Sequence, residues 1–397
     1  MNKNIKKVLV LWLGLATTSF ASDITSKKTP YRAVVIKQAV VSKEARRYCG
    51  WPSIAKLPNG SLAVVYSGDR DWHVCPWGKM KIVFSNNNGL DWSDNKTVTN
   101  TPLDDRDAGI LVTDKGTILI SWFTSLEFTK RKSKFYEKRY TQYAQHAGKL
   151  NTEIRQEWKG AWIRRSEDNG RSWSSPIKVP FVTPHGPIQL KNGRILLVTG
   201  AGVLESQDDG QSWKMIAEFS VKKNGKLSEV HAVELEDGKI IAMSRAPYLK
   251  QFESLDGGYT WSLPVETKIS GYPPHLIRLK NGWLVVVYGR RNSLPNGQFA
   301  CISRDGGKTW DVEHEITLSI ADKHRGTQEE LGYPPNWDLG YPCSVLLEDD
   351  TIWTVYYQVD KPGEWPCIIG THWKLEINED GVKSGKKSLI RNTSKER

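Results

Sequence analysis

The sequence lacks an apolar run long enough to anchor it permanently in a bilayer. The run Val8–Leu15 follows a Lys-rich start and precedes the triplet Ser-Phe-Ala ending at Ala21, a small-x-small shape typical of a secretory cleavage site. No Cys stands at that point for lipid attachment. We therefore expect a signal peptide at residues 1–21, an exported protein in the periplasm or the medium, and no membrane partner.

Cysteines are few, and their spacing resembles no zinc site. No acidic loop has the spacing of calcium ligands either, so we expect neither a metal nor a cofactor. Five cysteines in an exported chain permit two disulfides. We expect Cys49 to pair with Cys75 and Cys343 with Cys367, because each couple falls within one repeat unit of the chain.

Nucleic-acid motifs and basic helices are also missing, although the chain is strongly basic. Its formal charge is +12, and loss of three lysines with the signal peptide leaves +9. Such a charge suggests a polyanionic partner. Without a nucleic-acid motif, an acidic oligosaccharide suits an exported protein better than a nucleic acid. The sequence does not indicate an oligomeric state.

One eight-residue pattern, Ser-x-Asp-x-Gly-x-Thr-Trp, recurs along the chain, and we call it the Asp-box turn. Its Asp can bond nearby backbone amides, its Gly can adopt a positive φ, and its Trp is a large apolar anchor. We therefore expect these aspartates to hold hairpins together and not to act in catalysis. The four full copies and one degraded copy are Ser303–Trp310, Ser254–Trp261, Ser206–Trp213, Ser166–Trp173 and Ser85–Trp92.

A second repeat places a short polar turn, mostly Asn-Gly or Asp-Gly, before an apolar strand of four or five residues, which is a strong hairpin signal. Six such units predict an all-β fold, a six-bladed β-propeller with Asp-box turns over residues 22–397. The extended segment Tyr31–Val41 is expected to complete the last blade. The strands after these turns are Leu62–Tyr66, Ile118–Trp122, Ile195–Val198, Ile240–Met243, Leu284–Tyr288 and Ile352–Tyr356.

Chain direction sorts the loops onto two faces. Both kinds of turn fall on one face, which we interpret as scaffold, and the starts of first strands and ends of second strands fall on the other. That second face also receives a long insertion, residues 126–160, which we expect to be a lid or rim. Its central funnel mixes arginines, carboxylates, imidazoles and phenols, as acid–base chemistry on an anionic sugar requires. Asp105, Arg106 and Asp107 allow another interpretation, a structural knot of ion pairs.

The Asp-box turns and the blade count resemble the sialidase (neuraminidase, BNR-repeat) superfamily across nearly all the mature chain. In this family a Glu opens a blade, an Arg ends its paired strand and a Tyr opens the last blade, matching Glu229, Arg245 and Tyr341. The resemblance implies that the Tyr is a nucleophile and the Glu its base, with Asp69 or Asp71 as the acid. One motif departs: the Arg of Phe/Tyr-Arg-Ile-Pro is replaced by Gly50, and Arg290 or Arg291 can stand for the third family arginine.

These features leave three functions open. The first, which we favour, is acid–base elimination at a terminal uronic acid, of the lyase or dehydratase type. The second is a sialidase-like exo-glycoside hydrolase with Tyr341 as nucleophile, and the third is a lectin-like binder. The expected catalytic groups are Tyr341, Glu229, His73, Asp71 and His185; the expected substrate-binding groups are Arg245, Arg106, Arg290, Arg291, Arg47, Trp51, His231 and His275.

Overall fold

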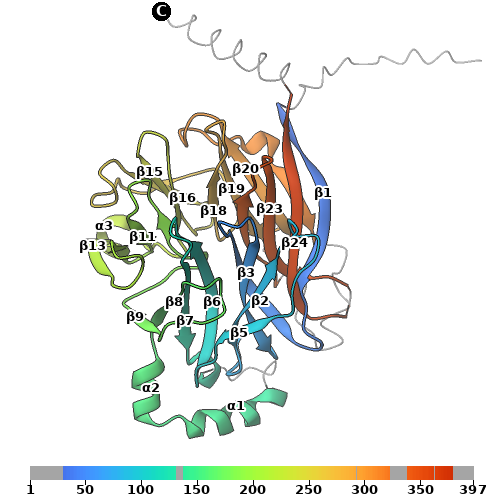
Figure 1. Cartoon of the computed structure of the whole chain (residues 1–397), viewed down its shortest axis with the longest axis vertical. Helices are drawn as coiled ribbons and strands as arrows, with labels where there is room; N and C mark the ends of the chain where they lie inside the picture. Colours follow the sequence, from blue (N-terminus) through green and yellow to red (C-terminus); the bar gives the residue numbers. More distant parts are fainter. Residues whose placement is uncertain (1–29, 131–136, 292, 322–337, 362, 379–397) are drawn as a thin grey trace, which may run out of the picture. The chain divides into compact units, whose positions relative to one another are not determined.

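Six four-stranded antiparallel sheets follow one another in the part of the chain that the computed structural model describes, residues 30–130, 137–291, 293–321, 338–361 and 363–378. The innermost strands of neighbouring sheets touch, as the contacts of β2 with β6 and of β18 with β22 show. The all-β fold, a six-bladed β-propeller with Asp-box turns, is therefore confirmed (Figure 1).

Each blade runs outward from its first strand, which lies next to the axis. Blade 1 comprises β2 (Tyr48–Lys56), β3 (Leu62–Arg70), β4 (Lys79–Ser85) and β5 (Lys96–Thr99). Blade 2 comprises β6 (Asp104–Val112), β7 (Ile118–Ser125), β8 (Ala161–Ser166) and β9 (Ile177–Val179). Blade 3 comprises β10 (Ile188–Gln189), β11 (Ile195–Val198), β12 (Gly202–Ser206) and β13 (Lys214–Glu218).

The second half of the chain repeats this order. Blade 4 comprises β14 (His231–Glu234), β15 (Ile240–Ser244), β16 (Lys250–Ser254) and β17 (Val265–Glu266). Blade 5 comprises β18 (His275–Arg278), β19 (Leu284–Arg290), β20 (Gly297–Ser303) and β21 (Ile316–Ile320). Blade 6 comprises β22 (Gly340–Leu346), β23 (Thr351–Val359), β24 (Pro366–Ile377) and β1 (Tyr31–Ser42), and two short helices, α3 (Val221–Asn224) and η3 (Val312–His314), lie between strands.

Strand β1 closes the propeller because it adds to β24, the last strand of the described chain. The pairing is antiparallel and extends from Tyr31 opposite Ile377 to Ser42 opposite Ile368. The predicted closing segment is confirmed. Strand β1 is then the outer strand of the sixth blade, so strands from both ends of the described chain form one sheet and close the ring.

The Asp-box turns are stitched as the sequence indicates. In the third blade, Ser206 Oγ donates to Asp208 at 2.8 Å and Ser212 N donates to the same carboxylate at 2.9 Å. Burial raises the pKa of Asp208, but the hydrogen bonds of the turn outweigh this effect and lower it. The carboxylate therefore stays ionised and accepts its hydrogen bonds within the turn. The following Trp213 packs against a buried cluster between blades, so these aspartates are scaffold.

The long insertion between β7 and β8 contains η1 (Glu127–Thr129), α1 (Glu137–Lys149) and α2 (Thr152–Trp158), seen below blade 2 in Figure 1. Its Tyr143 is buried in a cluster with Trp72 and Cys75 of blade 1. The Tyr143 hydroxyl also donates to Asp71 at 2.7 Å. The described part of the insertion is therefore fixed to the propeller through Tyr143.

The disulfide prediction is wrong, since all five cysteines are free thiols and buried. Cys49 packs in the core cluster shared by blades 1 and 6, whereas Cys75 lies in the cluster under the insertion. Cys343 is hydrogen-bonded to Ile54 at the axis, while Cys367 belongs to a different cluster. Members of each couple thus serve different cores.

The expected signal peptide, residues 1–21, lies outside the described residues. Within the described ranges, no helix is both long and apolar enough to span a membrane.

Candidate functional site

The first strands of blades 1, 2 and 6 are interrupted by irregular pairing near their starts, and these interruptions help to build the site. The pairing register shifts between Gly50 and Ser53, between Arg106 and Gly109, and between Gly340 and Cys343. Such bulges redirect a side chain. In five blades a residue within or just before the first strand has a left-handed backbone although it is not glycine: Trp51 (φ 54°), Asp107 (54°), His185 (73°), Glu229 (47°) and Tyr341 (54°).

Left-handed backbone costs a non-glycine residue about 1–2 kcal/mol, so five such residues at equivalent places mark strain that the fold maintains. Their side chains meet although they come from different blades. Tyr341 lies 6.4 Å from Trp51 and 6.3 Å from His185, measured between ring centroids. The strained bulges therefore gather one cluster of reactive side chains at the axis.

The most direct contact in this cluster joins Tyr341 to Glu229. The Tyr341 hydroxyl donates to Glu229 Oε1 at 2.6 Å, and Arg245 Nη1 donates to both Glu229 oxygens at 2.8 Å. Burial raises the pKa of Tyr341 well above its ordinary value, and the neighbouring carboxylates add to the rise. The phenol is therefore neutral and is held against a carboxylate that can take its proton.

Two arginines frame this pair. The Arg245 guanidinium lies 4.0 Å from the Tyr272 ring centroid, and Arg291 donates to the Tyr357 hydroxyl at 3.2 Å. Arg291 is also 5.8 Å from the Tyr341 ring, and its buried Nε has no hydrogen-bond partner among the described residues. The preceding residue, Arg290, instead pairs with Glu315 away from the axis. Of the two predicted alternatives, Arg291 reaches the site.

Trp51 forms a wall between the tyrosines and blade 2. Arg106 lies 4.5 Å from its ring centroid and Arg70 lies 4.8 Å from it. Arg70 is fully buried in an ion pair with Asp104 at 2.7 Å and is structural. A Cβ atom at Gly50 would come within 2.8 Å of the Tyr48 ring, which explains why no arginine stands in this position.

His73 and a carboxylate that the sequence did not reveal form a second reactive pair. His73 Nδ1 lies 3.0 Å from both oxygens of Asp338, and the His73 ring lies 5.0 Å from Trp51. Burial raises the pKa of Asp338, but His73, Arg291 and the Tyr357 hydroxyl together lower it to about 2. Since this carboxylate is an acceptor only, Nδ1 carries the proton, and Nε2 remains to exchange one.

Asp107 is another group that the sequence did not single out as a site residue. It is 7% exposed, and its Oδ1 has no hydrogen-bond partner among the described residues. Burial raises its pKa to about 7, Arg106 opposes the rise, and Glu229 adds to it. By contrast Asp105 accepts hydrogen bonds from Thr101 and Trp122, and Arg106 lies 3.7 Å from a carboxylate oxygen of Asp104.

Two further predicted site residues point elsewhere. Asp71 accepts hydrogen bonds from Trp77 at 3.2 Å and from Tyr143 at 2.7 Å, so it fastens the insertion. Arg47 is 3.4 Å from Asp69 and partly exposed. Asp69 pairs with Arg47 and Lys79, so both aspartates of this loop contact other side chains of the rim.

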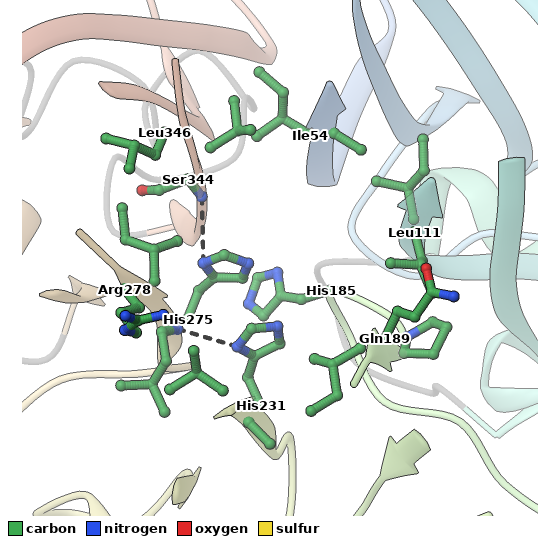
Figure 2. A pocket seen from close by; sticks show the side chains of 18 of the residues that line it. Ile54, Leu111, His185, Gln189, His231, His275, Arg278, Ser344 and Leu346 are labelled. Atoms are coloured by element: carbon green, nitrogen blue, oxygen red, sulfur yellow. Dashed lines mark hydrogen bonds between the residues drawn. The ribbon is translucent and has the colours of Figure 1, made fainter. Parts of the chain in front are cut away.

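The remaining histidines lie deeper along the axis than expected. His185, His231 and His275 line a cavity bounded by the first strands of all six blades, and Figure 2 shows the three rings facing one another. Glu229 and Tyr341 do not line this cavity. It ends at residues just before the Asn/Asp-Gly turns, on the face interpreted as scaffold. His231 and His275 therefore lie toward the scaffold end of the axis, whereas Tyr341 and Glu229 lie toward the other end.

This arrangement does not provide ligands for a metal. Among the described residues, no three His, Cys, Asp or Glu side chains are placed to hold an ion. His231 Nδ1 accepts from Leu276 N at 3.1 Å and His275 Nδ1 from Ser344 N at 3.3 Å. Each of these two rings therefore carries its proton on Nε2, which is unavailable to a metal in that state.

A six-bladed propeller with these repeats has the fold of the sialidase-like carbohydrate-active enzymes. The chain matches the BNR repeat-like domain over residues 140–353, more than half its length, and it belongs to this family within the sialidase superfamily. A curated relative, a sialidase of Bacteroides fragilis, is 24% identical over 234 residues, which are 49% of this chain and 38% of the relative. The match thus spans well under half of that protein.

Solved structures share the fold at low identity. A protein of unknown function from Dyadobacter fermentans is 23% identical, with a TM-score of 0.68 over 87% of this chain and 99% of its own. The NanB sialidase of Streptococcus pneumoniae is 14% identical, with a TM-score of 0.60 over 89% and 71%. The intramolecular trans-sialidase of Ruminococcus gnavus is 15% identical, with a TM-score of 0.55 over 88% and 97%.

Proposed function

We propose that this protein is a carbohydrate-active enzyme that cleaves a terminal acidic sugar from an oligosaccharide, with Tyr341 as nucleophile. The observation that carries the proposal is the 2.6 Å hydrogen bond from Tyr341 to Glu229. A neutral phenol suits an anomeric centre that bears a carboxylate, because a carboxylate nucleophile would be repelled. The relatives named as sialidases support a substrate of this class.

In the first step Tyr341 Oη forms a bond to the anomeric carbon while the bond to the leaving oxygen breaks. The phenolic proton passes to Glu229, and protonated His73 supplies a proton to the leaving oxygen. In the second step water attacks the same carbon, His73 accepts the proton of that water, and Tyr341 leaves and recovers its proton from Glu229. Asp338 accepts the hydrogen bond of His73 Nδ1–H, so Nε2 is the atom that gives the proton in the first step and takes it in the second.

The sugar carboxylate has two candidate partners beside this pair, Arg245 and Arg291, with Arg106 across Trp51. Arg291 is the best placed to gain from a ligand, because its Nε is buried with no hydrogen-bond partner among the described residues. A carboxylate that accepts this bond would satisfy a buried donor and a buried charge together. This supports recognition of an acidic sugar over a neutral one.

The His73–Asp338 pair favours a second candidate, elimination at a terminal uronic acid. Neutral His73 would take the proton on the carbon beside the carboxylate, an arginine would stabilise the resulting anion, and Tyr341 would protonate the departing oxygen. A departing sugar makes the enzyme a lyase, and departing water makes it a dehydratase. Each product carries a conjugated double bond.

The two reactions are separated by incubating the protein with 3′-sialyllactose and with uronate-terminated oligosaccharides. Displacement gives new reducing ends without ultraviolet absorbance, and elimination gives absorbance from the double bond. Absence of both signals would indicate a binder. Tyr341→Phe should abolish the reaction. Tyr288→Phe is the matched control, because Tyr288 also donates to a glutamate, Glu315, but lies outside the site. Full activity in Tyr341→Phe would exclude the nucleophilic role.

Export is part of the proposal, since the expected cleavage site follows Ala21. Expression of the full chain in a Gram-negative host, followed by N-terminal sequencing of protein from the periplasm and medium, tests it. A mature chain starting at Ser22 is the expected result, and an uncleaved chain confined to the cytoplasm would contradict it.

A further inference from the structure

The axial cavity on the face of the Asn/Asp-Gly turns has the construction of a ligand site. Its volume is about 490 Å³, within the range of small-molecule pockets. Aliphatic side chains from the first strands of different blades form much of its wall, among them Ile54, Val112, Ile188 and Leu346. The polar groups at its inner end come from three histidines of blades 3, 4 and 5 (Figure 2).

The histidine rings form one compact group. His231 and His275 are stacked with centroids 4.0 Å apart, and the ring of His185 stands edge-on at 5.1 Å from His275 and 6.0 Å from His231. All three are at least nine-tenths buried. Backbone amides of the next blade occupy Nδ1 of His231 and of His275, so their Nε2–H groups are donors.

Within the described part of the protein, the structure gives no hydrogen bond to Nε2 of His231 or His275. His185 Nε2 is buried and is also without a partner there, while its Nδ1 lies 3.4 Å from Ser53 Oγ. A buried unpaired donor destabilises a protein by about 1–3 kcal/mol unless something accepts its hydrogen bond. Burial lowers the pKa of His231 to about 3, so these rings present neutral N–H groups.

Charges of both signs lie at the mouth of the cavity. Lys56, Lys191 and Arg278 line it together with Glu234. Each cation also pairs with a carboxylate outside the lining, Glu348 or Glu236. The mouth is therefore polar and balanced in charge, and the N–H groups at the inner end are the part of the cavity suited to a carboxylate.

We propose that this cavity is a second binding site, for a small monocarboxylate with an apolar body. The carboxylate would accept hydrogen bonds from the Nε2–H groups of the histidines, and the apolar body would lie against the aliphatic wall. The proposal does not rest on the proposed function. Tyr341 and Glu229 do not line the cavity, although its His185 ring lies 6.3 Å from the ring of Tyr341.

Calorimetric titration of the full chain with benzoate tests the proposal. We expect one site per chain, at least tenfold weaker binding in His231→Gln, and unchanged binding in His314→Gln, which removes a histidine paired with Asp311 outside the cavity. Ile188→Trp fills the mouth and keeps all three histidines, so it should also abolish binding if His231→Gln does not fold.

Three results would overturn the proposal: no heat with the wild-type chain, equal binding in Ile188→Trp, or displacement of benzoate by glucuronate at equal affinity. The last would show that the aliphatic wall does not select the ligand. Tyr341→Phe should bind benzoate normally, which separates failure of this proposal from failure of the proposed enzyme activity.

Discussion

Replacing Asp107 with asparagine should make the protein more stable, and the gain should depend on pH. Burial raises the pKa of this carboxyl from 3.8 to about 7, and the side chain is only 7% exposed. Because the folded-state pKa is the higher one, the folded protein binds the proton more tightly, and wild-type stability falls as pH rises from 4 to 7. Three pKa units correspond to about 4 kcal/mol.

Asparagine resembles the protonated carboxyl and tolerates the left-handed backbone that residue 107 adopts. Urea unfolding of both proteins from pH 4 to 8 should show no difference at pH 4 and a gain of up to about 4 kcal/mol for Asp107→Asn at pH 8. A gain would identify a carboxylate retained for function and not for folding.

The control for this experiment is Asp105→Asn in the same strand. Asp105 accepts hydrogen bonds from Thr101 N at 2.8 Å, Thr101 Oγ1 at 3.0 Å and Trp122 Nε1 at 2.9 Å, and an amide cannot accept all three. Burial raises the pKa of Asp105 to about 7 as well, so this variant should show a similar rise in relative stability from pH 4 to 8, but offset at every pH by a loss of about 1–3 kcal/mol from the unmade hydrogen bonds. If Asp107→Asn is no more stable than wild type at pH 8, or if its gain does not vary with pH, the reasoning is refuted.

Three further predictions concern the His73–Asp338 pair, the Asp-box turns and the cysteine thiols. Asp338→Asn should lower kcat with a smaller effect on KM and should change the pH profile, because His73 loses the carboxylate that fixes its tautomer; an unchanged profile would argue against this role. Asp305→Ala should lower stability by about 1–2 kcal/mol and leave kcat unchanged, since Asp305 bonds only within its Asp-box turn. Titration with a thiol reagent in denaturant, without reductant, should find all five cysteines; only one reactive thiol would restore the two disulfides.

The fold was predictable because its signals are local. Turn residues such as Asn281-Gly282 and the Ser303–Trp310 box act within a few positions of the chain, and their repetition determines the number of blades. The disulfide prediction failed for the opposite reason. Sequence spacing placed Cys49 and Cys75 in one blade, but it carries no information on which core each side chain enters.

The site was predictable only in part, because the bulges cannot be read from the sequence. Glu229, Arg245 and Tyr341 follow from the family resemblance. Glu229 and His231 were expected to alternate along one strand, but β14 begins at His231 and Glu229 precedes it with a left-handed backbone. Asp338 was missed because it ends a long connection, three residues before Tyr341. The sequence signal that could have identified Asp338 is its position just before the blade that opens with Tyr341.

The central claim is that Tyr341 forms a covalent bond with the sugar. Its most direct test is mass spectrometry of the protein after reaction with 2,3-difluorosialic acid, a probe that forms a slowly hydrolysed glycosyl-enzyme. The account predicts loss of activity together with one sugar adduct on the peptide containing Tyr341, and no adduct in Tyr341→Phe. An enzyme that turns over acidic oligosaccharides to ultraviolet-absorbing products, with no adduct on Tyr341, would contradict it.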